Sequence, residues 1–585
     1  MASALRGNLR EGYTWRHLKS DLLAGITVGV VALPLAMALA IASGVAPQHG
    51  LYTAIVAGFI IAVTGGSRVN VSGPTAAFVV VLLPITHQYG LGGLLLATLM
   101  AGCLLIAMGV ARLGRFIELV PYPVVIGFTA GIGVVIATLQ VRDFLGLHID
   151  VLEGHYLHKV VLLGSALPTL SWSDVMIGMT TLGVLLFWPK LSRAIPGHLV
   201  ALTTGTLLAA LAPLWLADFH VATIGSRFSW TLDGISSPGI PPVLPGVQWP
   251  WQFPGADGQP LVLSVELVGS LIGPAFAIAM LGAIESLLCA VVADGMTGNR
   301  HDANAELIGQ GLGNIAAPFF GGIPATGAIA RTATNVRAGA VSPLASAIHA
   351  ITVLIAMLAL AKLLAYVPMA SLAALLLVVA WNMSEARHFV RVVRIAPASD
   401  VIVLLTCFGL TVLFDMVVAV TVGMGLAAVL FIKRVIDLTE GRFLERPLDG
   451  SHLKLQPTIA IYQINGSLFF GAAQKALATL RTIDRRKRIL ILDLSQVTVM
   501  DMSGLVALET LLENARRQHL SVILSGLLPR LSLKLRRAGI REHDHLIFAA
   551  NLDEATCKAR HLDSTSAATS HRPESNSATP AATKD

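Results

Sequence analysis

The chain has 585 residues, of which 55% are hydrophobic and 13% charged, with a mean hydropathy of +0.73. Soluble domains carry about 25% charged residues, so this composition excludes a soluble protein and predicts a polytopic α-helical membrane protein. The formal net charge of +7 fits Lys/Arg-rich cytoplasmic loops and does not indicate a nucleic-acid partner. The four cysteines lie far apart and show no metal-ligand spacing, and we expect neither a metal nor a cofactor.

The chain begins with a basic cytoplasmic segment, residues 1–20, which lacks a signal-peptide cleavage pattern, so the first apolar run is read as a retained span. We expect seven spans in the first half, near 22–43, 50–64, 69–86, 91–111, 121–140, 175–188 and 197–214. A polar stretch rich in Pro, Gly and Trp follows at 215–262. The second half predicts seven more spans, near 264–293, 303–320, 323–338, 342–364, 369–383, 399–414 and 416–432. The transport domain is thus expected over 21–435, with repeats at about 21–214 and 264–434.

The basic residues of the expected loops lie mostly on one side of the membrane. Besides the N-terminal segment, that side holds Arg112, Arg115, Lys190, Arg193, Arg300, Arg387, Arg391, Arg394, Lys433 and Arg434. The opposite side holds Arg142, Lys159, Arg227 and Lys362. The positive-inside rule therefore predicts that both termini are cytoplasmic. We expect the chain to lie in a bacterial inner membrane.

Two segments containing Pro and Gly interrupt apolar runs at matching places in the two halves. They are RVNVSGPTAAF (68–78) and IPATGAIARTATN (323–335), and Pro324 lies 250 residues after Pro74. Such paired breaks point to a transporter's binding site, where half-helix N-termini aim N–H groups at an anion. The predicted anion ligands are Gly73, Pro74, Thr75, Ala76, Ala325, Thr326, Gly327 and Ala328. The alternative is that these small residues only allow close helix packing.

Arg331 follows the second break and could supply further positive charge for the anion. About 10 Å of helix separates it from Pro324 at the standard rise, so it could act through its field rather than by direct contact. It could instead snorkel toward the cytoplasm or neutralise a buried acid.

Glu285 is an acid inside the eighth span, in LGAIESLL, and lies the same 250 residues after Leu35, which follows Pro34 in the first span. We therefore expect Pro34 and Leu35 to line the site. A carboxylate beside a bound anion repels it until protonated, so proton and anion should bind cooperatively. Glu285 is the predicted proton-coupling residue of an anion–proton symporter; the alternative is a permanent salt bridge to Arg331. A sodium site is less favoured because Leu281, one turn earlier, is not a second acid.

The polar start of the ninth span, from His301 to Gln310, is more typical of helix capping and interhelical hydrogen bonding than of substrate binding. After a linker at 436–451 the composition becomes that of a soluble α/β domain, expected over 452–560. Residues 561–585 are rich in Ser, Thr, Ala and Pro and are predicted to form a disordered tail.

Several motifs resemble the SulP family of sulfate permeases and solute-carrier-26 anion transporters. PQHGLYTAIVAGFIIAVTGGSR (47–68) resembles the family signature, with His49 where Tyr is usual, and LGAIESLLCAVVADGMTGNRHDANAELIGQGLGNIAAPFFGG (281–322) is at least as close. DLSQVTVMDMSGLVALE (493–509) resembles a STAS domain. Residues 32–48, 381–386 and 410–416 are similar to a branch that carries C4-dicarboxylates, whereas Leu35 and Leu39 replace the Gln and Tyr of many members.

The resemblance implies a seven-plus-seven inverted repeat like that of uracil permeases, in which a core domain holds the half-helices of spans 3 and 10. A gate domain near spans 5–7 and 12–14 would support elevator-like movement. It also implies homodimers assisted by the STAS domains, and a possible soluble cytosolic partner. Ser503 matches a serine that is phosphorylated in related anti-sigma antagonists, although N-capping of the following helix explains it without signalling.

The sequence thus predicts a secondary active transporter rather than an enzyme, taking up C4-dicarboxylates such as succinate, fumarate and possibly aspartate with protons. The alternatives within this class are bicarbonate or sulfate transport coupled to sodium or protons. Outside it, the chain could be a membrane-anchored STAS sensor or an anion channel. The embedded Arg331 and Glu285 count against a plain anchor.

Overall fold

The computed structural model describes residues 3–117, 120–149, 154–192, 195–216, 218–232, 235–414, 416–444, 456–478 and 486–569. The chain divides into two compact units, Met1–Ala427 and Ala428–Asp585, each of which is described by itself. Among the described residues, ten helices are long and apolar enough to span a membrane.

The N-terminal segment contains α1, and the first repeat contains helices α2 to α9. Their bounds are α1 Ser3–Arg10, α2 Trp15–Ala42, α3 Pro47–Thr64, α4 Ala76–Val110, α5 Gly114–Ile117, α6 Tyr122–Leu145, α7 Tyr156–Ala166, α8 Trp172–Leu191 and α9 Gly197–Leu211. The second repeat has α11 Val265–Thr297, α12 Ala303–Ala316, α13 Ile329–Arg337, α14 Pro343–Leu364, α15 Met369–Met383, α16 Ala386–Ile395, α17 Ala398–Leu413 and α18 Met416–Leu438. The predicted arrangement of seven plus seven membrane segments is confirmed, with α4 contributing two of them.

Gly90 divides α4 into the third and fourth spans. Its backbone angles, φ 70° and ψ −174°, lie outside the helical region and are open to glycine but not to L side chains. A β-carbon at this position would lie 2.2 Å from the carbonyl carbon of Gly255. The chain can therefore bend here only without a side chain, where it lies against Gly255 of the connection between the two repeats.

That connection contains little regular structure. It holds the short helix α10 (Ile224–Arg227), the antiparallel strands β2 (Ser229–Leu232) and β3 (Ile235–Pro238), and a 3₁₀ turn at Pro250–Gln252. The N–H of Gly92 donates to the carbonyl of Pro254 at 2.9 Å, which ties the connection to the start of the fourth span.

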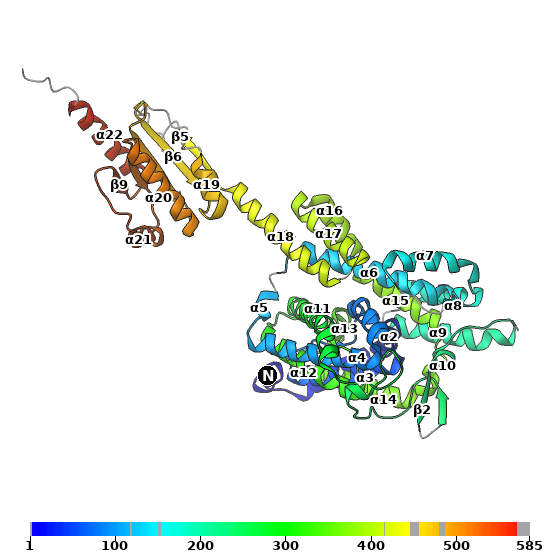
Figure 1. Ribbon diagram of the computed structural model, residues 1–585. Coiled ribbons are helices and arrows are strands. Elements are labelled where there is room, and N and C mark those ends of the chain that lie inside the picture. Colours follow the sequence, from blue (N-terminus) through cyan, green and yellow to red (C-terminus); the bar gives the residue numbers. More distant parts are fainter. Residues whose placement is uncertain are drawn as a thin grey trace, which may run out of the picture. The chain divides into compact units, whose positions relative to one another are not determined.

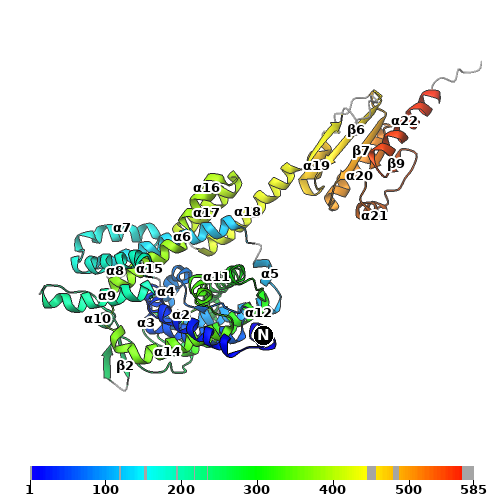
Figure 2. The same cartoon turned by 180° about the vertical axis from the view of Figure 1, so that it is seen from behind.

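The spanning helices form two bundles (Figures 1 and 2). The core bundle consists of α2, α3, α4, α11, α12, α13 and α14, which pack chiefly against one another. The gate bundle is built around α6, with α8, α9, α15 and α17. The two bundles meet where α15 packs against α2 and α4 against α6. The half-helices of spans 3 and 10 belong to the core, as predicted, and the structure adds spans 1, 2, 4, 8, 9 and 11 to it.

The second unit is a five-stranded sheet in the order β5-β6-β7-β8-β9. The strands are β5 Glu440–Leu444, β6 Ile459–Asn465, β7 Ile489–Gln496, β8 Ser521–Ser525 and β9 Leu546–Ala549, and only the β5–β6 pairing is antiparallel. The helices are α19 Phe470–Ala478, α20 Met502–Arg517, α21 Pro529–Arg537 and α22 Leu552–Thr569 (Figure 2).

Both faces of this sheet are buried, which explains the continuous apolar runs of its strands. Alternate residues such as Tyr462 and Leu492 pack with α20 and α21 on one face. Their neighbours, such as Ile461 and Ile491, pack with α22 on the other. The predicted small sheet covered by helices is confirmed.

Two predicted boundaries need correction. The predicted linker at 436–451 contains the edge strand β5 at residues 440–444. The sequence of this strand, EGRFL, gives no sign of its pairing with β6. The predicted tail from 561 is wrong in its first part, because α22 continues to Thr569 and packs through Leu562 on the sheet. Residues 445–455 and 570–585 lie outside the described residues.

Candidate functional site

The two predicted breaks lie side by side in the core bundle. Before α4 the chain forms the two-residue strand β1 (Ser72–Gly73), and before α13 it forms β4 (Thr326–Gly327). These strands pair in antiparallel register, Ser72 opposite Gly327 and Gly73 opposite Thr326. The pairing satisfies backbone groups that lipid cannot, which permits extended backbone at this depth. All eight residues predicted to bind the anion lie in or beside this bridge.

The first break leads directly into a helix. Thr75 is extended, with φ −124° and ψ 158°, and serves as the N-cap of α4, which begins at Ala76. The first N–H groups of a helix have no partner inside it and carry partial positive charge. Because Ala76 and Ala77 are small, an oxyanion can approach these N–H groups closely.

Glu285 of α11 reaches this helix end. Its Oε2 accepts a hydrogen bond from Thr75 Oγ1 at 2.8 Å. The Glu285 side chain is partly exposed, whereas the residues around it on α11 are mostly buried. The carboxylate thus lies at the positive end of α4.

Arg331 belongs to α13 of the second repeat, but its side chain reaches β1 of the first repeat. The residue is 2% exposed, and Nη2 donates to the carbonyl oxygen of Pro74. A β-carbon on Gly73 would lie 2.6 Å from Nη1, so only glycine lets the guanidinium lie against β1. Nε and Nη1 are buried without a hydrogen-bond partner among the described residues. Arg331 therefore brings spare donors directly to the first break.

Among the residues it describes, the structure shows neither a salt bridge between Arg331 and Glu285 nor snorkelling of Arg331. Within the described part of the chain, neither a hydrogen bond nor an ion pair joins the two side chains, which bond to Pro74 and Thr75 instead. The burial of Arg331 also excludes snorkelling to the cytoplasmic surface. The salt-bridge and snorkelling readings are wrong for this conformation.

The second break is braced by side chains from neighbouring helices. Asn314 of α12 accepts from the N–H of Ala325 at 2.8 Å and donates to its carbonyl at 2.9 Å. The N–H of Gly327 donates to Ser286 Oγ of α11 at 3.1 Å. These donors are therefore engaged within the protein.

The other residues of the second break are engaged as well. The hydroxyl of Thr326 is fully buried, donates to the carbonyl of Gly282 at 3.1 Å and lies 2.7 Å from Ser286 Oγ. The N–H of Ala328 donates to the carbonyl of Val71 at 2.9 Å. The expectation that residues 325–328 offer free donors is wrong, because α13 begins only at Ile329. The unpaired N–H groups of this half-helix belong to its first turn.

A buried polar network supports the bridge from α12. Glu306 accepts from the N–H of Gly66 at 2.9 Å and from Asn70 Nδ2 at 2.8 Å. Gln310 Nε2 donates to Ser72 Oγ at 2.8 Å. The predicted interhelical role for the polar start of the ninth span is confirmed. Sequence reasoning missed Asn70, whose signal is an amide inside the first break, before Gly73 and Pro74.

His349 of α14 is a further polar group that the sequence analysis did not single out. It is 1% exposed, and both ring nitrogens lack a partner among the described residues. A single histidine in an apolar span forms no pattern with other polar residues, so its burial in the core bundle could not be predicted from the sequence.

Pro34 and Leu35 lie inside α2, which packs against α13. Pro34 is buried and Leu35 partly buried. Their side chains have no polar atoms, so α2 offers only an apolar wall, and their predicted place at the depth of the breaks stays a prediction.

In the second unit, Asp501 rather than Ser503 caps α20. Its carboxylate accepts from the N–H of Gly504 at 2.8 Å, while Ser503 is exposed in the first turn. The capping explanation of Ser503 is therefore wrong. Its phosphorylation stays a prediction.

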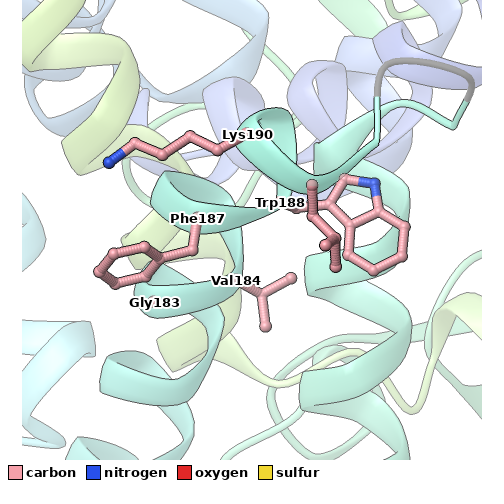
Figure 3. A pocket seen from close by; sticks show the side chains of 6 residues that line it. Gly183, Val184, Phe187, Trp188 and Lys190 are labelled. Carbon is pink, nitrogen blue, oxygen red and sulfur yellow. The ribbon is translucent and has the colours of Figure 1, made fainter.

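A surface hollow on α8 lies away from the breaks (Figure 3). Phe187 and Leu191 are largely exposed there, and the Lys190 ammonium lies 5.2 Å from the Phe187 ring centroid. Aromatic and basic side chains at the end of a spanning helix are typical of the membrane interface. Among the described residues no cluster of His, Cys, Asp or Glu could hold a metal ion.

Comparisons with known proteins agree with this architecture. Residues 18–406 match the Sulfate permease family, and residues 452–555 match the STAS domain. The chain is 40% identical over 532 residues to the "Putative sulfate transporter YvdB" of Bacillus subtilis, covering 91% of this chain and 95% of the relative. It is 30% identical to the "Bicarbonate transporter BicA" of Picosynechococcus, covering 88% and 89% of the two chains.

Two solved structures are similar. The transmembrane domain of a cyanobacterial BicA matches with a TM-score of 0.59 at 27% identity, covering 71% of this chain and 98% of that one. Murine Solute Carrier 26 family member A9 matches with a TM-score of 0.79 at 19% identity, covering 96% and 94%. The second likeness shows the fold alone. The chain belongs to the sulfate permease family and is an anion transporter of the membrane, with a C-terminal STAS domain, rather than an enzyme.

Proposed function

We propose that this protein is a proton-coupled anion symporter in which the anion binds between the α4 N-terminus and Arg331. The observation that carries the proposal is the position of Glu285, whose carboxylate bonds to Thr75 at the same helix end. Arg331 adds two nitrogen atoms that lack partners in the described part of the chain. The site thus combines positive charge for an anion with one acid that can hold a proton.

The coupling follows from electrostatics. The α4 N-terminus contributes about half a positive charge and Arg331 a full one. An ionised Glu285 cancels much of this charge and repels an arriving anion. Protonation removes that repulsion, so each ligand increases the affinity for the other. The loaded site then carries a proton and an anion together across the membrane.

We propose C4-dicarboxylates as the substrate class, on the likeness of residues 32–48, 381–386 and 410–416 to the branch of the family that carries them. Bicarbonate is the second candidate, because the BicA relatives are named as bicarbonate transporters. The proposal also places both termini in the cytoplasm, in accord with the basic loops on that side. It includes a homodimer assisted by the STAS domains, on the family resemblance alone.

Uptake into proteoliposomes tests this function. Labelled succinate, bicarbonate and sulfate are each offered with and without an inward proton gradient. We expect gradient-driven succinate accumulation that fumarate inhibits and sulfate does not. If the protein transports bicarbonate or sulfate but not succinate, the proposed substrate class is wrong. If the uptake of none of the three anions depends on the proton gradient, the symport mechanism is wrong.

Glu285→Gln isolates the coupling residue. The amide cannot carry the proton, so we expect proton-driven accumulation to be lost while exchange of labelled for unlabelled anion persists. Glu266→Gln is the matched control, because Glu266 is an exposed acid in the first turn of the same helix. Unchanged accumulation by Glu285→Gln would take this residue out of the mechanism.

A further inference from the structure

A cavity of about 310 Å³ lies between the core and gate bundles, away from the bridge of β1 and β4. Its walls come from α4 of the core, from α6 and α17 of the gate, and from α7. Val80, the first α4 residue of the lining, is about 6 Å along the helix from Ala76 at the standard rise. The cavity therefore begins one helical turn beyond the candidate anion site.

The polar groups of this cavity come largely from α7. Lys159, Tyr156 and His155 line it, together with Thr138 of α6. Tyr156 OH lies 3.0 Å from Thr138 Oγ1, a hydrogen bond that holds the start of α7 against α6. His155 is the N-cap of α7, and the first N–H groups of this helix have no partner inside it. The cavity thus has a lysine and a helix N-terminus on the same side.

Lys159 differs from Arg227, another cation expected on its side of the membrane. Arg227 is paired with Asp143 at 2.6 Å. Lys159 is partly buried, and among the described residues it has neither a hydrogen bond nor an ion pair from its side chain. The described lining of the cavity includes no acid. A partly buried ammonium that faces an open volume, with no counter-ion among the described residues, is suited to an anionic ligand.

We propose that this cavity is a second anion-binding site, in which Lys159 and the α7 N-terminus hold the substrate before it reaches α4 and Arg331. The site rests on the proposed function for its ligand class, a small carboxylate or other oxyanion. Five spans separate it from the amino terminus, so it faces the side opposite the N-terminal segment. A site here raises the local anion concentration at the junction along which core and gate meet.

Binding is tested by protection of a cysteine placed in the cavity. The background replaces the exposed Cys103 and Cys557 by serine and keeps the buried Cys289 and Cys407. Val412→Cys puts a thiol in the lining while Lys159 is retained. We expect succinate or bicarbonate to slow its reaction with N-ethylmaleimide, and this protection to disappear when Lys159→Gln is added. Protection that is absent, or equal in both proteins, would overturn the site even if transport is normal.

Kinetics provide the second readout in the full-length protein. Lys159→Gln should raise the KM for anion added on the α7 side about five-fold, and high salt should remove the difference from wild type. Lys362→Gln is the matched control, an exposed cation on the same side but outside the cavity. An unchanged KM would overturn the site. Failure of the wild type to transport any anion would instead count against the proposed function, and the protection assay would still decide binding.

The dependence of the KM on alkaline pH provides a third test. Burial lowers the pKa of Lys159 below the usual 10.5, so its charge is lost at a lower pH than that of a free lysine. His155 and Tyr156 are the other titratable groups of the lining. As the pH on the α7 side rises, the KM of the wild type should approach that of Lys159→Gln, while the variant changes less. Parallel curves would overturn the role of Lys159.

Discussion

The two breaks are related by the repeat, yet they differ in how their polar groups are used. At the first break Thr75 and the start of α4 face Glu285 and the guanidinium of Arg331. At the second, Asn314, Ser286 and Val71 occupy the polar groups of residues 325–328. At the first break the nitrogens Nε and Nη1 of Arg331 lack partners among the described residues, whereas side chains of α11 and α12 brace the second. We infer that the first, called the open break below, takes the ligand, and that the second, the braced break, holds the bridge in place. Internal symmetry places both at one depth but does not give them the same task.

The largest effect is expected from Arg331→Met, since this side chain connects the two breaks. Its loss leaves the first break without its nearest cation, and we expect anion uptake to fall about 100-fold, or about 2.7 kcal/mol. Uptake into proteoliposomes measures this. Arg337→Met, at the exposed end of the same helix, should transport normally. Near-normal uptake by Arg331→Met would show that the open break works without it.

Asn314→Ala tests the braced break. The substitution leaves the buried N–H and carbonyl of Ala325 without their partners, so we expect a loss of about 2 kcal/mol in the free energy of unfolding. Thermal unfolding of the purified protein in detergent reports the change. A midpoint equal to that of wild type would mean that the second break does not depend on this brace.

Thr75→Val tests the open break and should have the smallest effect. The variant keeps the shape of the side chain but removes the hydrogen bond to Glu285, and we expect uptake to fall about tenfold with little change in stability. Thr86→Val is the control, because among the described residues the Thr86 hydroxyl bonds only to the carbonyl of Leu82 in the same helix. If Thr75→Val lowered the free energy of unfolding and left uptake unchanged, the assignment of ligand binding to the first break and bracing to the second would be wrong.

Much of the architecture could be predicted because it depends on local sequence patterns. Pro74 and Pro324 mark both half-helices, the apolar runs give the spans, and the strands of the STAS domain are continuous apolar segments. The repeat offset linked Glu285 to the site, although not to its actual partner, Thr75.

The remaining features depend on contacts between distant segments. Asn314 and Ser286 occupy the second break from other helices, and no spacing in the sequence reports this. The edge strand β5 is recognisable only by its pairing with β6. The cap of α20 was misread because Asp501 and Ser503 are both good N-cap residues and stand two positions apart.

The pairing of β1 with β4 has a consequence for how the anion crosses. Backbone hydrogen bonds join the two repeats at the site itself, and the side chains of α11 and α12 reinforce that junction. Spreading the half-helices apart to release an anion would break this junction where lipid offers no replacement partners. We therefore infer that the candidate site travels intact with its cargo, and that the sliding surface lies along the contacts of α4 with α6 and of α2 with α15.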